Sequence, residues 1–375
     1  MPFKAIYFSR FQPSTDMGGG TRRMSQIYEM LKTVIPDIQL ISNQRGDRIP
    51  KKTRQKIKEM SYRNDFLAPV PLSWSLRKWS AEHKDMVYRH KKHAEIWTGA
   101  ITELPELDIV IMDDPIYFLP LFKKLRRLGI PIIAISQNIE SLSSFQVGKK
   151  WLLSLLKEEL GILRQCHLVI TISREENFLL NNLGIRTLYI PYYPVEPILG
   201  RLLAVRRQRE DNRKDGILMV GSAKNLPTRD GMAQAAAYWH KNHLDKTIGK
   251  LIIGGYKSET YFDPGLYGDA IDFRGTLTNE DLDNLLARVK AVLSYQEKGA
   301  GALTRNCEML IAGIPVLANT HAARSYYNMK GLFEFRELAQ IEEVLKQIDA
   351  FNGDIPLPPV PGVSSLETEI KKILH

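Results

Sequence analysis

The sequence predicts an α/β protein built from two parallel sheets, and three observations carry this prediction. Short β-branched and aliphatic runs recur along the chain with helical stretches between them, which is the pattern of βαβ units. A stretch rich in proline and charge, residues 194–215, separates these runs into two sets. The length of 375 residues suits two domains of roughly 150 to 200 residues each.

The predicted strands define the two domains. Those of the first half lie in FKAIYFS (3–9), IQLIS (38–42), DIVIMD (108–113), PIIAIS (131–136), LVITIS (168–173) and TLYIPY (187–192). Those of the second half lie in GILMVGS (216–222), KLIIGG (250–255), AIDFRG (270–275), KAVLSY (290–295) and PVLANT (315–320). We therefore expect an N-terminal domain over 1–195, a C-terminal domain over 210–355, and a terminal helix over 363–375 that packs back on one of them.

Composition narrows the class of protein. With 44% hydrophobic and 25% charged residues, the chain matches ordinary globular proteins and not disordered or fibrous ones. Its longest apolar runs, such as IPIIAIS, fall far short of the ~20 residues that cross a bilayer. The first residues, MPFKAIYFSRF, lack a signal-peptide core, which favours the cytoplasm. Cys166 and Cys307 have no metal-ligand spacing and suit a reducing compartment, so no metal is expected.

Residues 45–95 break the strand and helix alternation. They hold fourteen Lys or Arg against six Asp or Glu, so most of the net charge of +10 lies here. Trp74, Trp79 and Trp97 lie in this insertion or at its edge. Basic residues interleaved with Trp suit a peripheral contact with the inner membrane face or an anionic acceptor. The alternative is a solvated helical insertion whose tryptophans reach the core; a nucleic-acid partner is not expected.

The stretch GAGALTRNCEML, residues 299–310, is the strongest candidate for a binding site. A strand (KAVLSYQ) leads into a glycine-rich loop, and a helix follows that ends at Gly313, with Pro315 just beyond. Helical spacing puts one set of side chains on the buried face, namely Leu303, Cys307, Leu310 and Ile311. It turns Thr304, Arg305 and Glu308 outward.

A helix start after a bare loop is a good place for phosphate. Its N–H groups are unpaired, the helix dipole is positive there, and glycines let a ligand approach the backbone. The loop also follows a parallel strand, where open α/β sheets place ligands. We therefore predict a diphosphate cradle, with Glu308 one turn further on to accept hydrogen bonds from ribose. The alternative is a tight turn without a ligand.

Residues 274–320 resemble the carboxy-terminal domain of GT-B fold retaining glycosyltransferases of family four, the glycosyl transferases group 1. The resemblance lies in RGTLTNEDLDNLL, the glycine-rich loop and the segment EMLIAGIPV. DMGGGTRRM, ISQNIES and ILMVGSAKN resemble further segments of the family, so nearly the whole chain outside 45–95 is covered. The resemblance implies two Rossmann-like domains facing a central cleft, with the nucleotide-sugar donor on the second and the acceptor on the first.

The resemblance also implies roles for individual residues. Glu308 matches the second Glu of the Glu-x7-Glu motif, which binds the donor ribose, and Arg274 matches the segment that lines the base. The diphosphate loop comprises Gly301 and the backbone N–H groups of Ala302, Leu303 and Thr304. Gly221 and Ser222 end the matched strand ILMVGS on the donor side. Gly19 and Gly20 match the loop that closes over the phosphates, and Asn138 and Glu140 match the amino-terminal side of the sugar pocket.

Three positions depart from the family pattern. Ala300 stands where the first Glu of the motif would contact the sugar, and Gln137 replaces a common His. The Arg and Lys that neutralise the diphosphate have no clear equivalents. Lys224, Arg229 and Arg305 are substitutes by type, and Arg305 is preferred because it follows the cradle; Arg305 and Lys224 are the candidate catalytic residues.

The resemblance implies a metal-independent, retaining hexosyltransferase without a cofactor beyond its donor substrate. It would move sugar from a nucleotide-diphosphate sugar to a glycan, lipid-linked or small-molecule acceptor in surface polysaccharide or glycoconjugate biosynthesis. The alternatives are a nucleotide-sugar 2-epimerase-like enzyme, which the loss at Ala300 disfavours, and a degenerate GT-B binding subunit.

Two other pairs of residues have two interpretations each, and a third pair has one. Asp113 and Asp114 resemble a metal pair, but turn or capping residues are the preferred interpretation. Arg22 and Arg23 suit either an anionic acceptor or a solvated helix start, and Tyr192 and its neighbour Tyr193 are expected to be packing residues.

Overall fold

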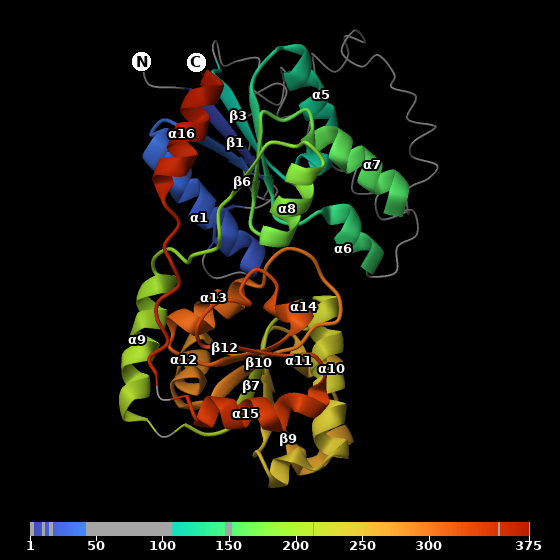
Figure 1. The fold of residues 1–375 in the computed structure, drawn as a ribbon, viewed down its shortest axis with the longest axis vertical. Helices are drawn as coiled ribbons and strands as arrows, with labels where there is room; N and C mark the ends of the chain where they lie inside the picture. The colour runs from blue at the N-terminus through green and yellow to red at the C-terminus, as the bar shows by residue number, and fades with distance from the viewer. Residues whose placement is uncertain are drawn as a thin grey trace, which may run out of the picture. The chain divides into compact units, whose positions relative to one another are not determined.

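A computed structural model describes residues 4–9, 12–14, 18–42, 107–146, 152–212, 214–351 and 353–374. The chain forms two compact units, each described here by itself. Unit 1 comprises Met1–Ser14, Ile27–Pro191 and Gly362–His375, and unit 2 comprises Thr15–Gln26 and Tyr192–Pro361. Each unit contains one six-stranded parallel sheet with helices beside it, which confirms the predicted α/β class (Figure 1). The basic insertion over 45–95 and its tryptophans lie outside the described residues.

The sheet of unit 1 has the strand order β2-β1-β3-β4-β5-β6. Its strands are β1 (Ala5–Ser9), β2 (Gln39–Ser42), β3 (Ile109–Asp113), β4 (Ile132–Ser136), β5 (Leu168–Thr171) and β6 (Thr187–Tyr189). The accompanying helices are α1 (Gly19–Val34), η3 (Pro115–Phe118), α5 (Leu119–Arg127), α6 (Glu140–Gln146), α7 (Leu152–Leu163), α8 (Arg174–Asn182) and α16 (Val363–Leu374). Only the part of α1 from Ile27 onward belongs to unit 1, since its residues before Ile27 belong to unit 2. Because β2 and β3 lie on opposite sides of β1, the order of the strands reverses between β1 and β3.

The sheet of unit 2 has the order β12-β11-β10-β7-β8-β9. Its strands are β7 (Ile217–Val220), β8 (Leu251–Gly254), β9 (Ile271–Gly275), β10 (Ala291–Ser294), β11 (Val316–Asn319) and β12 (Leu332–Phe335). The longer helices are α9 (Ile198–Asp211), α10 (Leu226–Lys241), α12 (Asn279–Arg288), α13 (Thr304–Ile311) and α15 (Ile341–Asp349). The shorter ones are α11 (Ser258–Tyr261), α14 (Thr320–Ala323), η4 (Leu244–Lys246), η5 (Pro264–Ala270) and η6 (Leu338–Gln340). Counted from β7, this is the doubly wound order 3-2-1-4-5-6, which reverses between β7 and β10.

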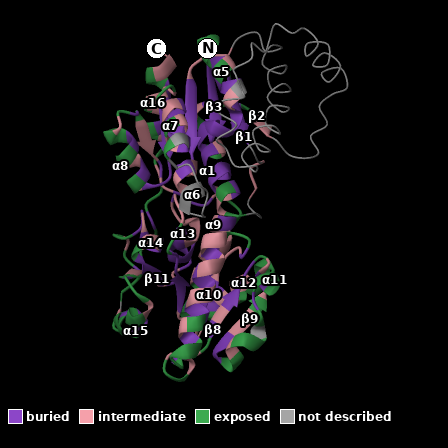
Figure 2. Cartoon of the chain, turned by 90° about the vertical axis from the view of Figure 1, so that its right-hand side faces the viewer, coloured by how far each residue is buried: buried purple, intermediate pink, exposed green. Residues whose placement is uncertain are grey.

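Local sequence explains why these elements form. All five residues of β3 and of β4 are buried, as expected for parallel strands covered on both faces, and Figure 2 shows the buried strands of both sheets in purple. Helix α12 begins with a capping box in which Thr278 and Asp281 exchange side-chain and backbone hydrogen bonds. Helix α13 ends before Gly313, whose φ of 70° is favourable for glycine.

Two segments differ from the sequence prediction. Residues 194–215, expected to form the connection, instead contain α9 of unit 2, which buries Ile198, Leu202, Val205 and Arg209. Helical spacing was present in the sequence, but an arginine on the buried face disguised it. Strand β12 was not predicted, because LFEF carries a glutamate and lies at the edge of the sheet.

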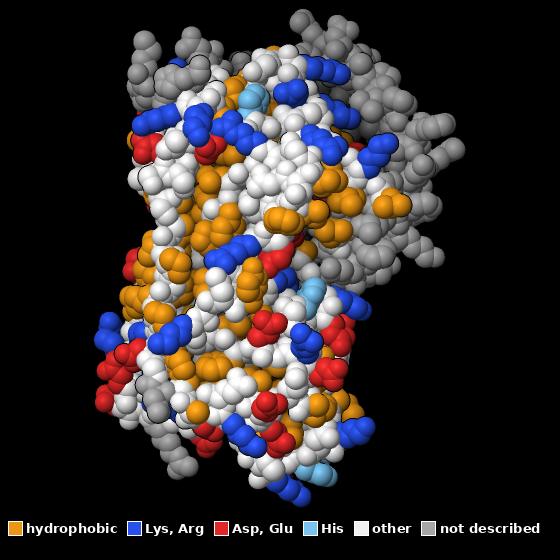
Figure 3. Space-filling model, viewed as in Figure 1, with side chains coloured by type: hydrophobic (Ala, Val, Ile, Leu, Met, Phe, Trp, Pro, Cys, Tyr) orange, Lys and Arg blue, Asp and Glu red, His pale blue; other side chains and the backbone are white. Residues whose placement is uncertain are grey.

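The surface and the helix lengths bear on membrane contact. Among the described residues, no helix combines the length and the apolar character that a bilayer crossing requires. On the face drawn in Figure 3, Lys and Arg side chains predominate over unit 1, whereas unit 2 mixes both signs of charge. The expected peripheral membrane contact through 45–95 stays a prediction, since that segment is not described.

Candidate functional site

The candidate site in unit 2 lies where the strand order reverses. The loop after β7 contains Gly221, Ser222 and Lys224, and the loop after β10 runs from Tyr295 to Leu303. Since β7 and β10 are neighbouring parallel strands, their carboxyl ends meet at the same edge of the sheet. Open α/β sheets bind ligands at this edge, beside such a reversal.

The glycine-rich loop after β10 is fixed by one arginine from α14's C-terminal end. Arg324 donates from Nε to the carbonyl of Gly301 (2.6 Å) and from Nη2 to that of Ala300 (3.0 Å). His321 approaches the carbonyl of Gly299 at 3.1 Å. Gly299 has a φ of 125°, and a Cβ there would lie 3.1 Å from Arg324 Nη2. The loop therefore needs glycine and is held in one shape before any ligand arrives.

The first turn of α13 retains unpaired backbone donors. Leu303 occupies the N-cap position, where no side chain provides a capping hydrogen bond. Thr304 opens the helix, and its Oγ1 would lie 2.4 Å from a Cβ placed on Gly19. Gly19, the first residue of α1, thus approaches the start of α13 more closely than any side chain would allow. The structure brings together the two glycine loops that the sequence analysis assigned to one ligand.

Arg305 lies in the centre of this group. Its Nη1 donates to the carbonyl of Val220 at the end of β7 (3.0 Å). Its Nε is shielded from solvent and has no hydrogen-bond partner among the described residues. A Cβ on Gly221 would lie 2.4 Å from Arg305 Nη1, so this glycine makes room for the guanidinium.

The charge of Arg305 is not neutralised by any acidic side chain of the described chain. No carboxylate there lies within ion-pair distance of it, and burial together with the charge of Arg324 lowers the pKa of Arg305 to about 10. A half-buried guanidinium beside a second one, next to unpaired N–H groups, has the donors and charge that suit an anion with several oxygens.

Glu308 corrects one prediction. It is buried, with 5% of its surface exposed, and does not point outward as helical spacing suggested. Oε2 accepts from Arg22 Nη1 (2.7 Å), and Oε1 accepts from Tyr192 Oη (2.7 Å). Leu303, expected on the buried face, is half-buried. The helix is turned so that the carboxylate packs among Arg22 and Tyr192.

The other predicted residues of unit 2 come from several strands, helices and loops. Arg274 is the next-to-last residue of β9, and its guanidinium pairs with Asp272 (2.7 Å) on the surface. Lys224 is exposed in the loop after β7, and Ser222 in the same loop is half-buried. Gly20 is exposed in the first turn of α1, and Ala302 is half-buried next to Leu303.

Asn138 and Glu140 belong to unit 1; Asn138 lies in the loop between β4 and α6, and Glu140 is the first residue of α6. Asn138 Nδ2 donates to Glu140 Oε1 (3.2 Å), and Tyr117 Oη donates to Glu140 Oε2 (2.5 Å). They form a local polar cluster at the carboxyl end of the unit 1 sheet. Whether they share a ligand with the residues of unit 2 stays a prediction.

Asp113 and Asp114 end β3 in the same region. Asp113 accepts from Ser9 Oγ (3.1 Å) and from Gln137 Nε2 (3.0 Å), and Asp114 accepts from the backbone N–H of Gln137 (3.2 Å). Asp114 precedes η3 with a φ of 50° but makes no capping hydrogen bond. Within the described parts of the chain, no group of three His, Cys, Asp or Glu is arranged to hold a metal ion. The pair therefore ties strand ends to the next loop.

Sequence reasoning missed three residues. Tyr192 was expected only to pack, Arg22 was assigned to an anionic acceptor or a solvated helix start and not to Glu308, and Arg324 was not considered. Arg22 lies 286 positions from Glu308 along the chain, so no local pattern could connect them. Arg23, for which a solvated helix start was one interpretation, is instead buried. The sequence showed only that the stretches RRM and HAARSYY contain arginines, and not what these arginines contact.

No family model matches the sequence, and no curated protein matches it significantly. Solved structures do match in fold. Sucrose-phosphate synthase from Thermosynechococcus elongatus has a TM-score of 0.62 at 15% identity, covering 99% of this chain and 94% of that chain. An α,α-trehalose-phosphate synthase (UDP-forming) from Burkholderia xenovorans, in complex with glucose-6-phosphate, gives 0.57 at 10% identity over 99% and 95%. Anabaena HepE, in complex with UDP and glucose, gives 0.56 at 11% identity over 99% and 97%.

Proposed function

We propose, from the GT-B fold that this chain shares with known glycosyltransferases, that the protein transfers a sugar from a nucleotide-diphosphate donor. The observation that carries the proposal is Arg305. A half-buried guanidinium that has no carboxylate partner among the described residues, at the reversal point of a doubly wound sheet, is stabilised once an anion occupies the site. A diphosphate would neutralise this guanidinium. It would also accept hydrogen bonds from the N–H groups of Leu303 and Thr304 at the first turn of α13.

The chemistry follows from the leaving group. When the bond between the sugar and the donor breaks, negative charge builds on the diphosphate. Arg305 and the backbone donors are already fixed in place by Val220 and Arg324, so little reorganisation is needed at the moment of reaction. Lys224 in the loop after β7 is the proposed second cation. These charges are proposed to replace a metal ion.

The remaining contacts of the donor are proposed from the predicted roles. Glu308 would accept from the ribose, the backbone at Arg274 would line the base, and the first turn of α1 at Gly19 and Gly20 would close over the phosphates. Asn138 and Glu140 of unit 1 would contact the sugar. We propose retention of configuration and a glycan, lipid-linked or small-molecule acceptor, in surface polysaccharide or glycoconjugate biosynthesis.

The test is nucleoside diphosphate affinity in an Arg305→Met variant. Calorimetric titration with UDP, GDP and ADP should show one of them binding to the wild type. Loss of a charge-assisted hydrogen bond to phosphate should weaken it about 10- to 100-fold. Arg201→Met is the matched control, because Arg201 pairs with Asp283 on the surface of unit 2. Equal affinities for Arg305→Met and the wild type would refute the proposal.

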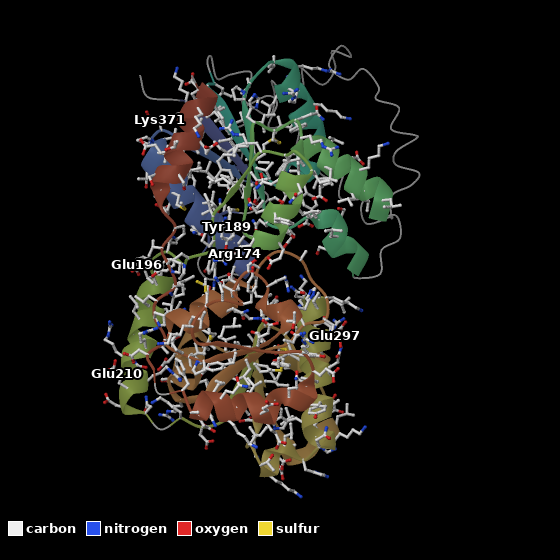
Figure 4. All side chains as sticks on the ribbon, viewed as in Figure 1. Arg174, Tyr189, Glu196, Glu210, Glu297 and Lys371 are labelled. Atoms are coloured by element: carbon white, nitrogen blue, oxygen red, sulfur yellow. The ribbon has the colours of Figure 1, made fainter. Side chains whose placement is uncertain are left out.

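A binding subunit without turnover is the second candidate, and Ala300 favours it. Glu297, labelled in Figure 4, follows β10, but its carboxylate accepts from Gln234 (3.0 Å) and from Tyr295 (3.1 Å) and so does not replace the missing motif Glu. Incubation with a panel of nucleotide sugars separates the two candidates. Nucleoside diphosphate release with added acceptor supports the transferase, whereas binding with no release under any condition supports the binding subunit.

A further inference from the structure

Both oxygens of Glu308 are engaged by other residues of unit 2. Oε2 accepts the charge-assisted hydrogen bond from Arg22, and Oε1 accepts from the Tyr192 hydroxyl, each at 2.7 Å. The carboxylate is buried, so little of it remains open to a further donor. A ribose hydroxyl that binds Glu308 must therefore share or take one of these two oxygens.

Tyr192 and Arg22 differ in how easily a ligand could displace them from Glu308. Tyr192 is 2% exposed, and burial together with Glu308 raises the pKa of its phenol, which keeps it a neutral donor. The Cys307 thiol also contacts its backbone carbonyl, which holds the segment on α13. Arg22 has 22% of its side chain exposed and lies in the first turn of α1, beside the close contact of Gly19 with Thr304. Oε2, held by Arg22, is the oxygen that a ligand can reach.

We propose that Arg22 is a positioning residue that competes with the donor ribose for Glu308 Oε2. This inference rests on the proposed function, since it assumes a nucleotide at the loop of residues 299–303. In the free protein the ion pair joins Arg22 to α13, while the close approach of Gly19 to Thr304 holds the first turn of α1 there independently of that pair. Nucleotide binding loosens that pair, so Arg22 sets the affinity for the ribose and leaves the diphosphate contacts at Arg305 unchanged.

The experiment separates ribose from diphosphate. UDP, GDP, ADP, their 2′,3′-dideoxy counterparts and inorganic pyrophosphate are titrated calorimetrically into wild type, Arg22→Met and the Arg201→Met control. We expect Arg22→Met to bind the ribonucleotide about fivefold more tightly, the scale of a partly exposed ion pair. Affinities for the dideoxynucleotide and for pyrophosphate should not change, and Arg201→Met should match the wild type throughout.

Three outcomes would overturn the inference. Weaker pyrophosphate binding in Arg22→Met would mean that Arg22 binds phosphate directly. An unchanged ratio of ribonucleotide to dideoxynucleotide affinity would mean that no competition exists; in both cases the diphosphate site, and so the proposed function, would stand. Wild type that binds neither nucleotide nor pyrophosphate would remove the proposed function itself, and the inference with it.

A measurement on the wild type keeps the inference testable should Arg22→Met not fold. Salt screens the partly exposed ion pair of Arg22, and it lowers phosphate affinity equally for the two nucleotides. The ribonucleotide to dideoxynucleotide affinity ratio should therefore rise between about 0.02 and 0.5 M NaCl. A ratio that stays constant over this range would overturn the competition.

Discussion

Arg305 depends on the absence of a side chain at its neighbour. Gly221 leaves space where the guanidinium passes the end of β7 to reach the carbonyl of Val220. The glycine is needed for this close approach and not for an unusual backbone angle, since its φ is not positive. The identity of one small residue thus decides where the half-buried charge of Arg305 lies.

Gly221→Ala tests this dependence. The added methyl group would lie 2.4 Å from Arg305 Nη1 and 2.9 Å from Thr228 Cγ2, so the guanidinium must move. We expect nucleoside diphosphate affinity to fall about tenfold, near the cost of losing one charge-assisted hydrogen bond. Gly161→Ala in α7 is the control, because a Cβ there has no neighbour within 4 Å. Unchanged calorimetric affinity for Gly221→Ala would show that the position of Arg305 does not matter.

Helix α6 of unit 1 shows how an element can depend on one buried acid. Glu159 of α7 accepts from the backbone N–H of Glu140 (2.8 Å) and of Ser141 (2.9 Å), so it fixes the start of the helix that carries Glu140. Burial raises the pKa of Glu159 to about 7, against the hydrogen bonds, which lower it. The element is therefore sensitive to pH near neutrality.

We expect the free energy of unfolding to depend on pH, because the pKa of Glu159 is raised in the folded state. The pKa of Glu159 is about 7 when folded and 4.5 ordinarily, so its contribution to stability is fully present below 4.5 and is lost as pH rises through 7. The free energy of unfolding should lose about 3 kcal/mol from this group over that interval. Urea unfolding of wild type and Glu159→Gln from pH 4.5 to 8 checks it: the variant should have the flatter profile. Parallel profiles would contradict the assignment.

At the scale of the molecule, the chain returns to unit 1 at its end. Helix α16 groups with unit 1 although the preceding residues from Tyr192 to Pro361 form unit 2. Leu366 and Ile370 of α16 are fully buried, and Glu369 pairs with Arg186. Figure 1 shows α16 in red among the elements of unit 1. The last residues therefore contribute to the stability of the first sheet.

Leu366→Ala tests this contribution. Removing a fully buried leucine side chain should cost about 2 to 5 kcal/mol of unfolding free energy. Hydrogen exchange should become faster in β1 and the other strands of unit 1 while β7 to β12 keep their protection. Leu357→Ala, at an exposed position of unit 2, should change neither. Equal acceleration in both units would mean that they unfold together.

The sequence by itself determined eleven of the twelve strands in the described residues. Each of the eleven predicted runs contains a strand, and the helix after the glycine-rich loop begins one residue from the predicted start at Leu303. These features depend on local chemistry: β-branched runs, glycines and capping residues act over a few positions. The prediction of a diphosphate loop with Arg305 also depends on local chemistry, because its strand, loop and helix are contiguous in the sequence.

Only the tertiary structure decided how Glu308 is used. Its partners Arg22 and Tyr192 come from distant parts of the chain, and the rotation of α13 that buries the carboxylate depends on packing against them. Nothing in the sequence indicated that Arg324 holds the glycine-rich loop or that β12 lies at the edge of the sheet. Side-chain contacts between distant segments form only when the sheet has assembled, so no periodicity or local motif records them.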